Sequence, residues 1–193
     1  AGSTEVAVFR DGSILAYDFI PIGGDFITND IAIGLRIPFM QAEEIKRQYA
    51  CCHRGLASEK YDIEIHSIGD KNSRKISQSD LATIVEPRVQ EILSYVARSV
   101  KSMTEKSMLP AGAVLTGGGL IHIEGAMDMA QQFLGIPVRP GVHGSFESEQ
   151  TFTVGLGLMY YFLKNRADNK VVMRERPVLS LFERVKNLIK EYF

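Results

Sequence analysis

The sequence predicts an α/β fold in which a smaller subdomain is inserted between two parts of a parent domain. Two β-rich runs, Glu5–Arg10 and Ser13–Ile22, open the chain, and the Asp11-Gly12 dipeptide between them favours a hairpin. A later apolar run, Ala113–Thr116, leads into consecutive glycines and then into helical spacing. Helical patterns with a few short strands fill the chain between these regions. We therefore expect a mainly helical insertion within an α/β parent.

Two helices are expected after the hairpin. Gly23-Gly24-Asp25 ends the second strand, and Phe26–Leu35 then carries apolar residues at helical spacing. Pro38 ends that helix, because proline is disfavoured in a helix interior. Ala42–Tyr49 shows the same kind of spacing and predicts a second helix.

The inserted region is expected to contain a small sheet and one long helix. Tyr61–Ile68 alternates apolar and polar residues as a strand does, and Arg74–Ile76 extends the sheet. Ser79-Asp80 is a capping pair and predicts a helix over about residues 81–106. Pro87 lies within this helix, so we expect either a kink or two abutting helices.

The second part of the parent domain follows the insertion. Ala113–Thr116 predicts a short buried strand, and Pro137–Arg139 predicts another. A helix is expected between them over Glu124–Leu134. Phe152–Leu163 is apolar and contains glycine, which predicts a helix packed against a neighbouring element.

The end of the chain has a different pattern. Residues 164–176 are polar and predict a linker, whereas residues 177–193 predict an amphipathic helix beginning at Pro177. Its apolar positions recur at helical spacing: Val178, Leu181, Phe182, Val185, Leu188, Ile189, Tyr192 and Phe193. The segment 164–193 carries a net charge of +4, whereas the whole chain carries −1. A basic amphipathic helix suits a membrane surface, a partner groove or the chain's own core, but it is too charged to span a bilayer.

Composition and charge argue against several classes of protein. A net charge of −1 over 193 residues gives no electrostatic case for nucleic-acid binding. Cys51 and Cys52 are adjacent, which fits neither a disulfide framework nor a zinc site and favours a reducing cytoplasm. The four histidines show no metal-ligand spacing. Because the chain starts in a loop that leads straight into a strand, we expect it to be part of a longer protein.

Two segments have the chemistry of a phosphate site. Gly117, Gly118 and Gly119 follow a strand and allow backbone amides to approach a phosphate, although no P-loop is present. Ser3 and Thr4 offer hydroxyls just before the hairpin, as a phosphate-gripping turn would. A plain tight turn and an ordinary loop are the alternative interpretations of these two segments.

Two groups of charged side chains are further candidates. Glu43, Lys46 and Arg47 share one helix face, where a carboxylate can accept hydrogen bonds from ribose hydroxyls and a long cation can cover adenine. Glu86 and Arg88 flank Pro87 and could pair with each other or meet a peptide. For both groups the alternative is a solvated charged surface.

Several of these segments together resemble a known family. Gly2–Phe9 is similar to the end of the second phosphate motif of actin-like ATPases, whose opening aspartate and glycines are absent here. Ala42–Arg47 resembles the adenosine-contacting helix of those proteins, and Leu115–Gly125 resembles their adenosine motif. Ile22–Ala32 and Leu81–Leu93, which contains Val85-Glu86-Pro87-Arg88, are similar to segments of the bacterial cell-division family FtsA. The amphipathic end separates this family from most actin-like relatives.

The resemblance implies half of an actin-like (ribonuclease H-like) ATPase fold. Residues 1–36 and 110–163 would form subdomain IIA and residues 37–109 subdomain IIB, followed by the linker 164–176 and the membrane-targeting helix 177–193. ATP with Mg²⁺ would bind between this half and the missing one. The resemblance places the glycines Gly117–Gly119 at the nucleotide, Glu43, Lys46 and Arg47 at ribose and adenine, and Ser3 and Thr4 near the phosphates and Mg²⁺.

By the same resemblance the chain is an adaptor with weak ATPase activity at most. It would polymerise with itself, meet other division proteins, and bind the C-terminal tail of FtsZ near Glu86 and Arg88. Its terminal helix would attach FtsZ filaments to the cytoplasmic face of the cell membrane at the septum. The membrane-facing residues would be Val178, Leu181, Phe182, Val185, Leu188, Ile189 and Phe193. The alternatives are another actin-like filament or pilus-assembly adaptor, or a kinase or hydrolase of the same fold.

Overall fold

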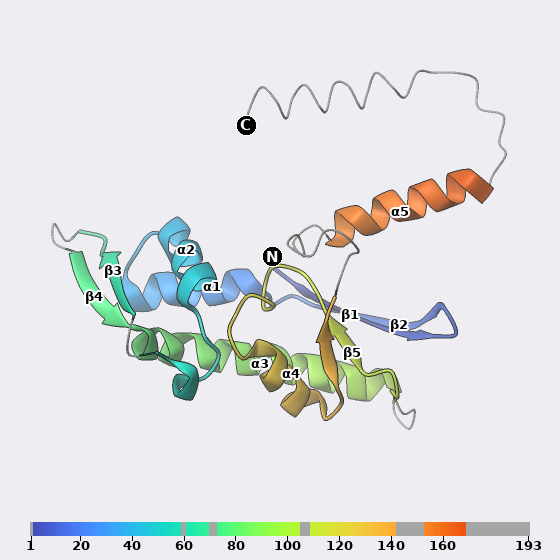
Figure 1. The fold of residues 1–193 in the computed structure, drawn as a ribbon, viewed down its shortest axis with the longest axis horizontal. Coiled ribbons are helices and arrows are strands. Elements are labelled where there is room, and N and C mark those ends of the chain that lie inside the picture. Colours follow the sequence, from blue (N-terminus) through green and yellow to red (C-terminus); the bar gives the residue numbers. More distant parts are fainter. Residues whose placement is uncertain (1, 59–60, 70–72, 105–108, 142–152, 169–193) are drawn as a thin grey trace, which may run out of the picture. The chain divides into compact units, whose positions relative to one another are not determined.

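The computed structural model describes residues 2–58, 61–69, 73–104, 109–141 and 153–168. Two compact units are distinguished, Ala1–Thr153 and Val154–Phe193. The first unit contains the hairpin, the inserted region and the glycine turn, and α3 runs along all of them (Figure 1). The division into subdomains IIA and IIB remains a prediction.

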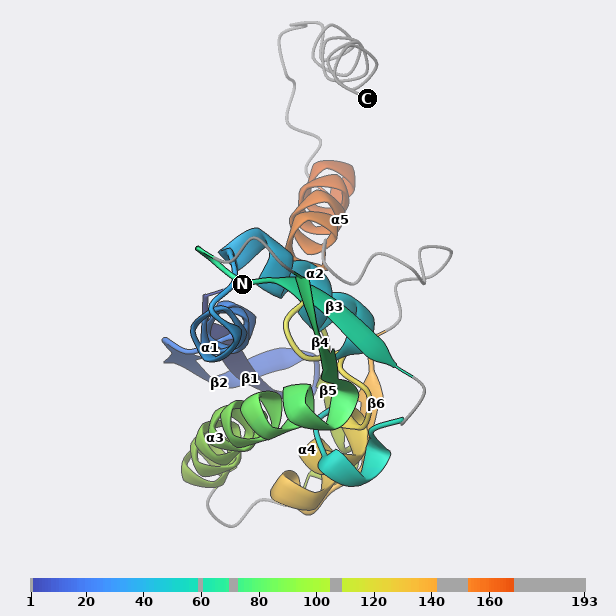
Figure 2. The same ribbon diagram turned by 90° about the vertical axis from the view of Figure 1, so that its left-hand side faces the viewer.

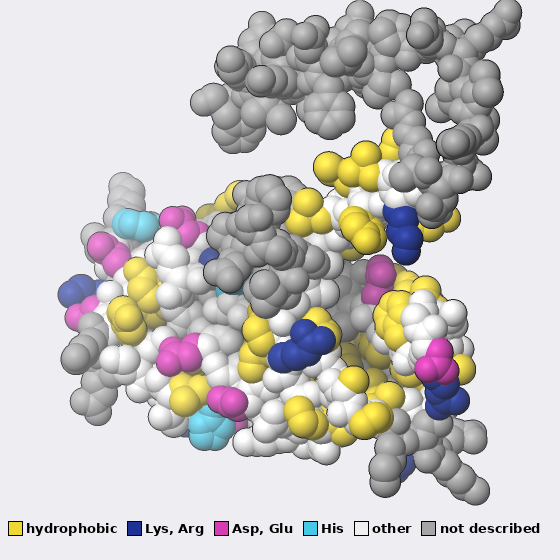
Figure 3. Space-filling model, turned by 45° about the vertical axis from the view of Figure 1, so that its right-hand side comes forward, with side chains coloured by type: hydrophobic (Ala, Val, Ile, Leu, Met, Phe, Trp, Pro, Cys, Tyr) yellow, Lys and Arg dark blue, Asp and Glu magenta, His cyan; other side chains and the backbone are white. Residues whose placement is uncertain are grey.

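The chain opens with the predicted hairpin. β1 (Thr4–Arg10) pairs antiparallel with β2 (Ser13–Ile20), with a bulge between Val8 and Phe9. Asp11 and Gly12 both have positive φ, 51° and 78°, as the two central residues of a type I′ turn require. Val6, Val8 and Ile20 are buried on the inward face of the hairpin, whereas Figure 3 shows hydrophobic side chains exposed at this end of the molecule.

Both predicted helices after the hairpin are present and begin earlier than expected. α1 (Gly24–Leu35) starts at the second glycine, and α2 (Phe39–Tyr49) starts directly after Pro38. Arg36 ends α1 in the left-handed conformation, and its N–H reaches back to the last turn. The buried residues of α1 repeat at helical spacing and form its inner stripe: Gly24, Ile27, Thr28, Ile31 and Leu35.

The small sheet of the insertion is confirmed. β3 (Asp62–His66) pairs antiparallel with β4 (Ser73–Ser77), and Ile63, Ile65 and Ile76 point into the core. The 3₁₀ turn η1 (Arg54–Leu56) lies between α2 and this sheet.

The long helix α3 (Gln78–Thr104) is one continuous element, so the prediction of two abutting helices was wrong. Pro87 is exposed, and so is Thr83, the residue whose carbonyl a proline at position 87 cannot pair with. The predicted Ser79-Asp80 cap was also wrong. Ser77 caps the helix instead, because its hydroxyl accepts from the Asp80 N–H (3.0 Å) while Asp80 accepts from the Ser77 N–H (3.1 Å).

The hydrophobic core lies along α3. Leu81, Val85, Val89 and Ile92 recur at three- and four-residue spacing and are fully buried. One part of the helix packs against α1, η1 and β4, and the other packs against β1, β2 and α4 (Ala126–Leu134). Figure 2 shows α1 and the β1–β2 hairpin above α3, with α4 beside it. The helix therefore connects the insertion to the parent domain.

The last strands form a separate parallel pair. β5 (Ala113–Leu115) pairs with β6 (Val138–Pro140), and α4 connects them. The expectation that this strand is buried was wrong, since Val114 is 49% exposed. A cavity of about 770 Å³ with largely apolar lining lies between β1, α3, α4 and this pair. Among the described residues, β1–β2 and β5–β6 are accordingly two sheets with the cavity between them.

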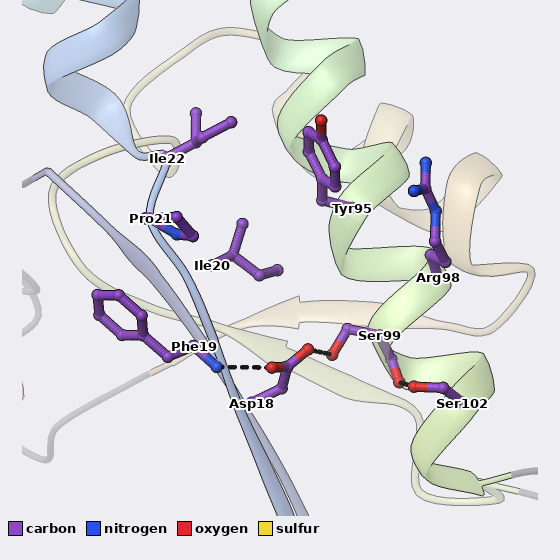
Figure 4. A pocket seen from close by; sticks show the side chains of 9 residues that line it. All are labelled: Asp18, Phe19, Ile20, Pro21, Ile22, Tyr95, Arg98, Ser99 and Ser102. Atoms are coloured by element: carbon purple, nitrogen blue, oxygen red, sulfur yellow. Dashed lines mark hydrogen bonds between the residues drawn. The ribbon is translucent and has the colours of Figure 1, made fainter.

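A smaller cavity of about 450 Å³ lies beside β2 and the C-terminal half of α3 (Figure 4). Asp18 closes one side by accepting from the Ser99 hydroxyl at 2.6 Å. The guanidinium of Arg98 lies 5.1 Å from the centre of the Tyr95 ring. Each side of this cavity therefore carries a charged and an aromatic side chain, Asp18 and Phe19 from β2 and Arg98 and Tyr95 from α3.

The second unit contributes α5 (Thr153–Asp168). A helix is confirmed from Thr153, and it continues through Asp168 into the segment predicted as a linker. The expectation that this helix is packed against a neighbouring element is not confirmed, since Val154, Leu158 and Tyr160 are 65–72% exposed. Within the part of the chain that the structure describes, no helix is long and apolar enough to cross a membrane. The amphipathic segment 177–193 lies outside the described residues.

Candidate functional site

The glycine turn after β5 touches the beginning of α1. A Cβ atom built on Gly24 would lie 2.7 Å from the Cα of Gly119, and one built on Gly119 would lie 3.4 Å from the Gly24 nitrogen. Gly117 has φ +93°, a conformation that L side chains rarely adopt. Glycine is therefore required at Gly24, whereas a Cβ on Gly119 would only reach ordinary van der Waals contact. This contact joins the two parts of the parent domain.

A polar cluster lies directly behind Gly24. The side chain of Lys46 on α2 is buried (4% exposed) and donates to the Gly24 carbonyl (3.2 Å), the Thr28 hydroxyl (2.8 Å) and the Glu43 carboxylate (2.6 Å). The Thr28 hydroxyl donates to the same carboxylate oxygen at 2.5 Å. An ammonium group has three donors, and all of them have acceptors here. Lys46 therefore fixes α2 against the first turn of α1.

Glu43 is the member of this cluster that reaches the surface, with 30% of its side chain exposed. Partial burial opposes its ionisation, but hydrogen bonds from Lys46 and Thr28 outweigh burial and lower the pKa of Glu43. The carboxylate is thus kept ionised and oriented at the edge of the glycine contact. An ionised, partly exposed carboxylate can accept hydrogen bonds from the hydroxyls of a ligand.

The other predicted nucleotide residues are placed differently. Arg47 is exposed and points away from the buried side of α2, unlike Lys46. The Thr4 hydroxyl donates to the Ile22 carbonyl at 2.7 Å, which ties the start of β1 to the segment after β2. Ser3 is half-buried beside it. The structure therefore brings Glu43 and Lys46 together with the glycine turn, but Thr4 has a structural partner of its own.

The predicted pair Glu86 and Arg88 points in two directions. Glu86 accepts from the Arg54 N–H at 3.3 Å and thereby holds η1. Arg88 grips both carboxylate oxygens of Asp30 on α1, with Nε–Oδ2 at 2.5 Å and Nη2–Oδ1 at 3.1 Å. Side chains two positions apart on a helix do not share a face. The two side chains therefore do not form one charged pair.

Arg88 lies at the seam between α1 and α3. Its Nη1 also donates to Glu91, and its guanidinium carbon lies 5.8 Å from the centre of the Phe26 ring. The hydrogen bond to Asp30 raises the pKa of Arg88 above its already high ordinary value. The guanidinium is thus permanently charged and held in one orientation.

A family model described as "Cell division protein FtsA" matches residues 1–157. The chain belongs to the FtsA family. The FtsA protein of Pseudomonas aeruginosa is 35% identical over the whole of this chain and 49% of its own length. That of Bacillus subtilis is 37% identical over 85% of this chain and 37% of its own length. The chain thus spans about half the length, or less, of these curated FtsA relatives.

Solved structures show the fold of this FtsA-family chain. MreB5 of Spiroplasma citri bound to ADP superposes with a TM-score of 0.64 over 87% of this chain and 53% of that protein, at 17% identity. The PilM–PilN type IV pilus biogenesis complex gives a TM-score of 0.60 over 83% of this chain and 43% of that one, at 22% identity. Both likenesses confirm the predicted actin-like ATPase fold.

Sequence reasoning missed Gly24, Thr28 and Asp30 as members of these sites. Gly24 had a local signal, because two glycines preceded the helical spacing. Thr28 and Asp30 had none, since their roles depend on partners from α2 and α3 that are distant in the sequence. Among the described residues, no three His, Cys, Asp or Glu side chains lie together so as to hold a metal ion.

Proposed function

We propose that this chain is the part of an FtsA-type adaptor that binds ATP on one side of α1 and the tail of FtsZ on another. The adaptor polymerises and attaches FtsZ filaments to the cytoplasmic face of the membrane at the division site. The match of the FtsA family model to residues 1–157 carries this proposal. The adaptor hydrolyses nucleotide weakly at most, and nucleotide binding promotes its polymerisation.

The glycine contact and Glu43 support the nucleotide site. Gly24 and Gly119 leave no side chain between their backbones, which fits a ligand that needs backbone to approach closely. The ionised Glu43 carboxylate suits the hydroxyls of ribose. Lys46 has no donor left for a base, so its role is to position Glu43. Binding of ATP, with Mg²⁺ on its phosphates, would stabilise the assembled state of the adaptor relative to the free state.

The remaining predicted contacts of the nucleotide follow from this placement. Gly117 and Gly118 belong to the same turn as Gly119 and would offer backbone amides to the ligand. Arg47 is exposed on the same helix as Glu43 and would cover the base. Ser3 would lie near the phosphates, whereas Thr4 holds the backbone of that loop through Ile22.

The seam between α1 and α3 is the proposed surface for the FtsZ tail. Arg88 has donors beyond those used by Asp30 and Glu91, because a guanidinium carries five N–H groups. Phe26 lies under the guanidinium, and Ile33 is seven residues further along α1 on the same side. Ile33 is 68% exposed. A peptide with a carboxylate and apolar side chains would match this surface.

The terminal segment 177–193 is proposed to bind the membrane as an amphipathic helix. A single helix of this kind binds lipid weakly and reversibly. Polymerisation strengthens attachment, because many helices on one filament raise the avidity.

The proposal is tested by titrating the chain into a fluorescent FtsZ C-terminal tail peptide and following anisotropy. We expect saturable binding in the micromolar range, on the order of −8 kcal/mol. Ile33→Ser should weaken binding, because Ile33 lies on the proposed surface. Ile14→Ser is the matched control, since Ile14 is similarly exposed (63%) but lies on the hairpin. A folded chain that does not bind, or equal effects of the two substitutions, would overturn this surface.

A further inference from the structure

Helix α1 connects the two proposed sites through residues only two positions apart. Thr28 is bonded to Glu43 and Lys46 on α2, and Asp30 is bonded to Arg88 on α3. We propose that α1 couples the nucleotide site to the peptide surface, so that each ligand changes the affinity for the other. This inference rests on the proposed function of the two sites.

The nucleotide end of α1 is poised to respond to a ligand. The same oxygen of Glu43 accepts from both Thr28 and Lys46, and this side chain is partly exposed. A ligand hydroxyl that donates to Glu43 competes with these two bonds. Because Lys46 and Thr28 also bind the Gly24 carbonyl, any rearrangement reaches the first turn of α1 directly.

The helix can transmit a displacement as a rigid body. Ile27, Thr28 and Ile31 are fully buried and pack in the core. Close-packed interiors have little room for internal deformation, so a shift of the first turn moves the whole helix. At about 1.5 Å per residue, Asp30 is roughly 9 Å along the axis from Gly24.

A movement of α1 would change the proposed peptide surface through Arg88. Asp30 fixes two of the three guanidinium nitrogens, and Phe26, from the first turn of α1, lies beside the guanidinium. A movement of α1 therefore reorients the donors that Arg88 offers outward. Further along α1, the two helices α1 and α3 also lie close together at Gly34, where an added Cβ would lie 2.9 Å from Ile84 Cδ1.

The test measures both ligands on the full-length FtsA-type adaptor that contains this chain, because ATP is expected to bind between this half and the other one. A fluorescent ATP analogue and the FtsZ tail peptide are titrated alone and then each in the presence of the other at saturation. We expect at least about a fivefold change in the dissociation constant of each, equal in both directions because coupling free energies are reciprocal.

Thr28→Val keeps the shape of the side chain and removes its hydroxyl, so the coupling factor should fall toward one. Thr83→Val on α3 makes the same chemical change at an exposed site and should leave the coupling factor intact. Asp30→Asn tests the other end of the helix if Thr28→Val does not fold.

The outcomes separate the two proposals. If either ligand fails to bind the folded full-length wild-type adaptor, the proposed function is wrong for that site and the coupling is overturned with it. If both ligands bind but neither affects the other, the sites stand and the coupling through α1 is refuted. Equal coupling in wild type and in Thr28→Val also refutes the role of this helix.

Discussion

The backbones of Gly24 and Gly119 touch, since a Cβ atom on Gly24 would lie 2.7 Å from the Cα of Gly119. A methyl group added at Gly24 would meet the backbone of Gly119, and backbone atoms cannot rotate away as a side chain can. We expect Gly24→Ala to lower the free energy of unfolding by about 1–3 kcal/mol, the usual cost of overpacking.

Gly34→Ala is the matched control on the same helix. Its added Cβ would meet the tip of the flexible Ile84 side chain, and alanine is the better helix former by about 1 kcal/mol. We expect little change or slight stabilisation. Urea denaturation of both variants measures the difference, and equal effects would contradict the close contact at Gly24.

The N-terminal cap of α3 gives a second prediction. Ser77→Ala removes the hydroxyl that accepts from the Asp80 N–H, which should cost about 0.5–2 kcal/mol of stability. Ser79→Ala should cost much less, because the Ser79 hydroxyl only meets the exposed Arg54 side chain at 3.4 Å. Thermal denaturation of the two variants decides whether Ser77 or Ser79 caps the helix.

The depressed pKa of Glu43 predicts a dependence of stability on pH. A carboxyl whose pKa is lower in the folded chain stabilises it fully above the ordinary value of 4.5, and loses this contribution as pH falls through the folded value. The stability difference between wild type and Glu43→Gln should therefore be largest at neutral pH and shrink below about pH 4.5.

Glu44→Gln is the control for this experiment, because Glu44 is exposed and meets only Gln48 at 3.4 Å. Its effect on stability should be small at every pH. A Glu43→Gln difference that grows on acidification would contradict the hydrogen-bonded carboxylate.

The adjacent cysteines should be inert in the folded chain. Burial raises the pKa of Cys52 to about 11 and also raises the pKa of Cys51, so almost no reactive thiolate exists at neutral pH. We expect iodoacetamide to leave both thiols unmodified in native buffer and to alkylate both in concentrated urea. Mass spectrometry counts the adducts, and fast alkylation of the native chain would contradict this environment.

The terminal segment gives the last prediction. Phe182→Glu places a charge on the apolar side of the predicted helix, and loss of one buried aromatic should reduce partitioning to anionic vesicles by about tenfold or more. Asn187→Glu adds the same charge on the polar side and should have the smaller effect. Vesicle co-sedimentation compares them, and unchanged binding of Phe182→Glu would refute the membrane-binding face.

Local sequence patterns predicted most of the secondary structure. The Asp11-Gly12 turn, the α1 and α2 spacing and the alternation in β3 each depend on neighbouring residues, and each was found. The errors in secondary structure arose where the local environment of one residue differed from what its sequence neighbours suggested. Ser77 forms the N-terminal cap of α3 in place of Ser79, and the exposed position of Pro87 allows the helix to continue.

The candidate sites were harder to predict than the fold. Glu43 and Lys46 were identified as a shared helix face, but their pairing with Thr28 and Gly24 joins segments that only the fold brings together. Arg88 was identified without its partner Asp30, which lies 58 positions earlier in the chain. Periodicity gives no information about contacts over such separations.

The cavity between β1 and the β5–β6 pair has a consequence for local opening. β5 and β6 have three residues each, and among the described strands each pairs only with the other. Their amides should exchange with solvent deuterium well before those of α3, whose inner face is fully buried. We therefore expect β5, the strand that leads into the glycine turn, to open before α3 does, and a molecule that filled the cavity should slow exchange in this strand.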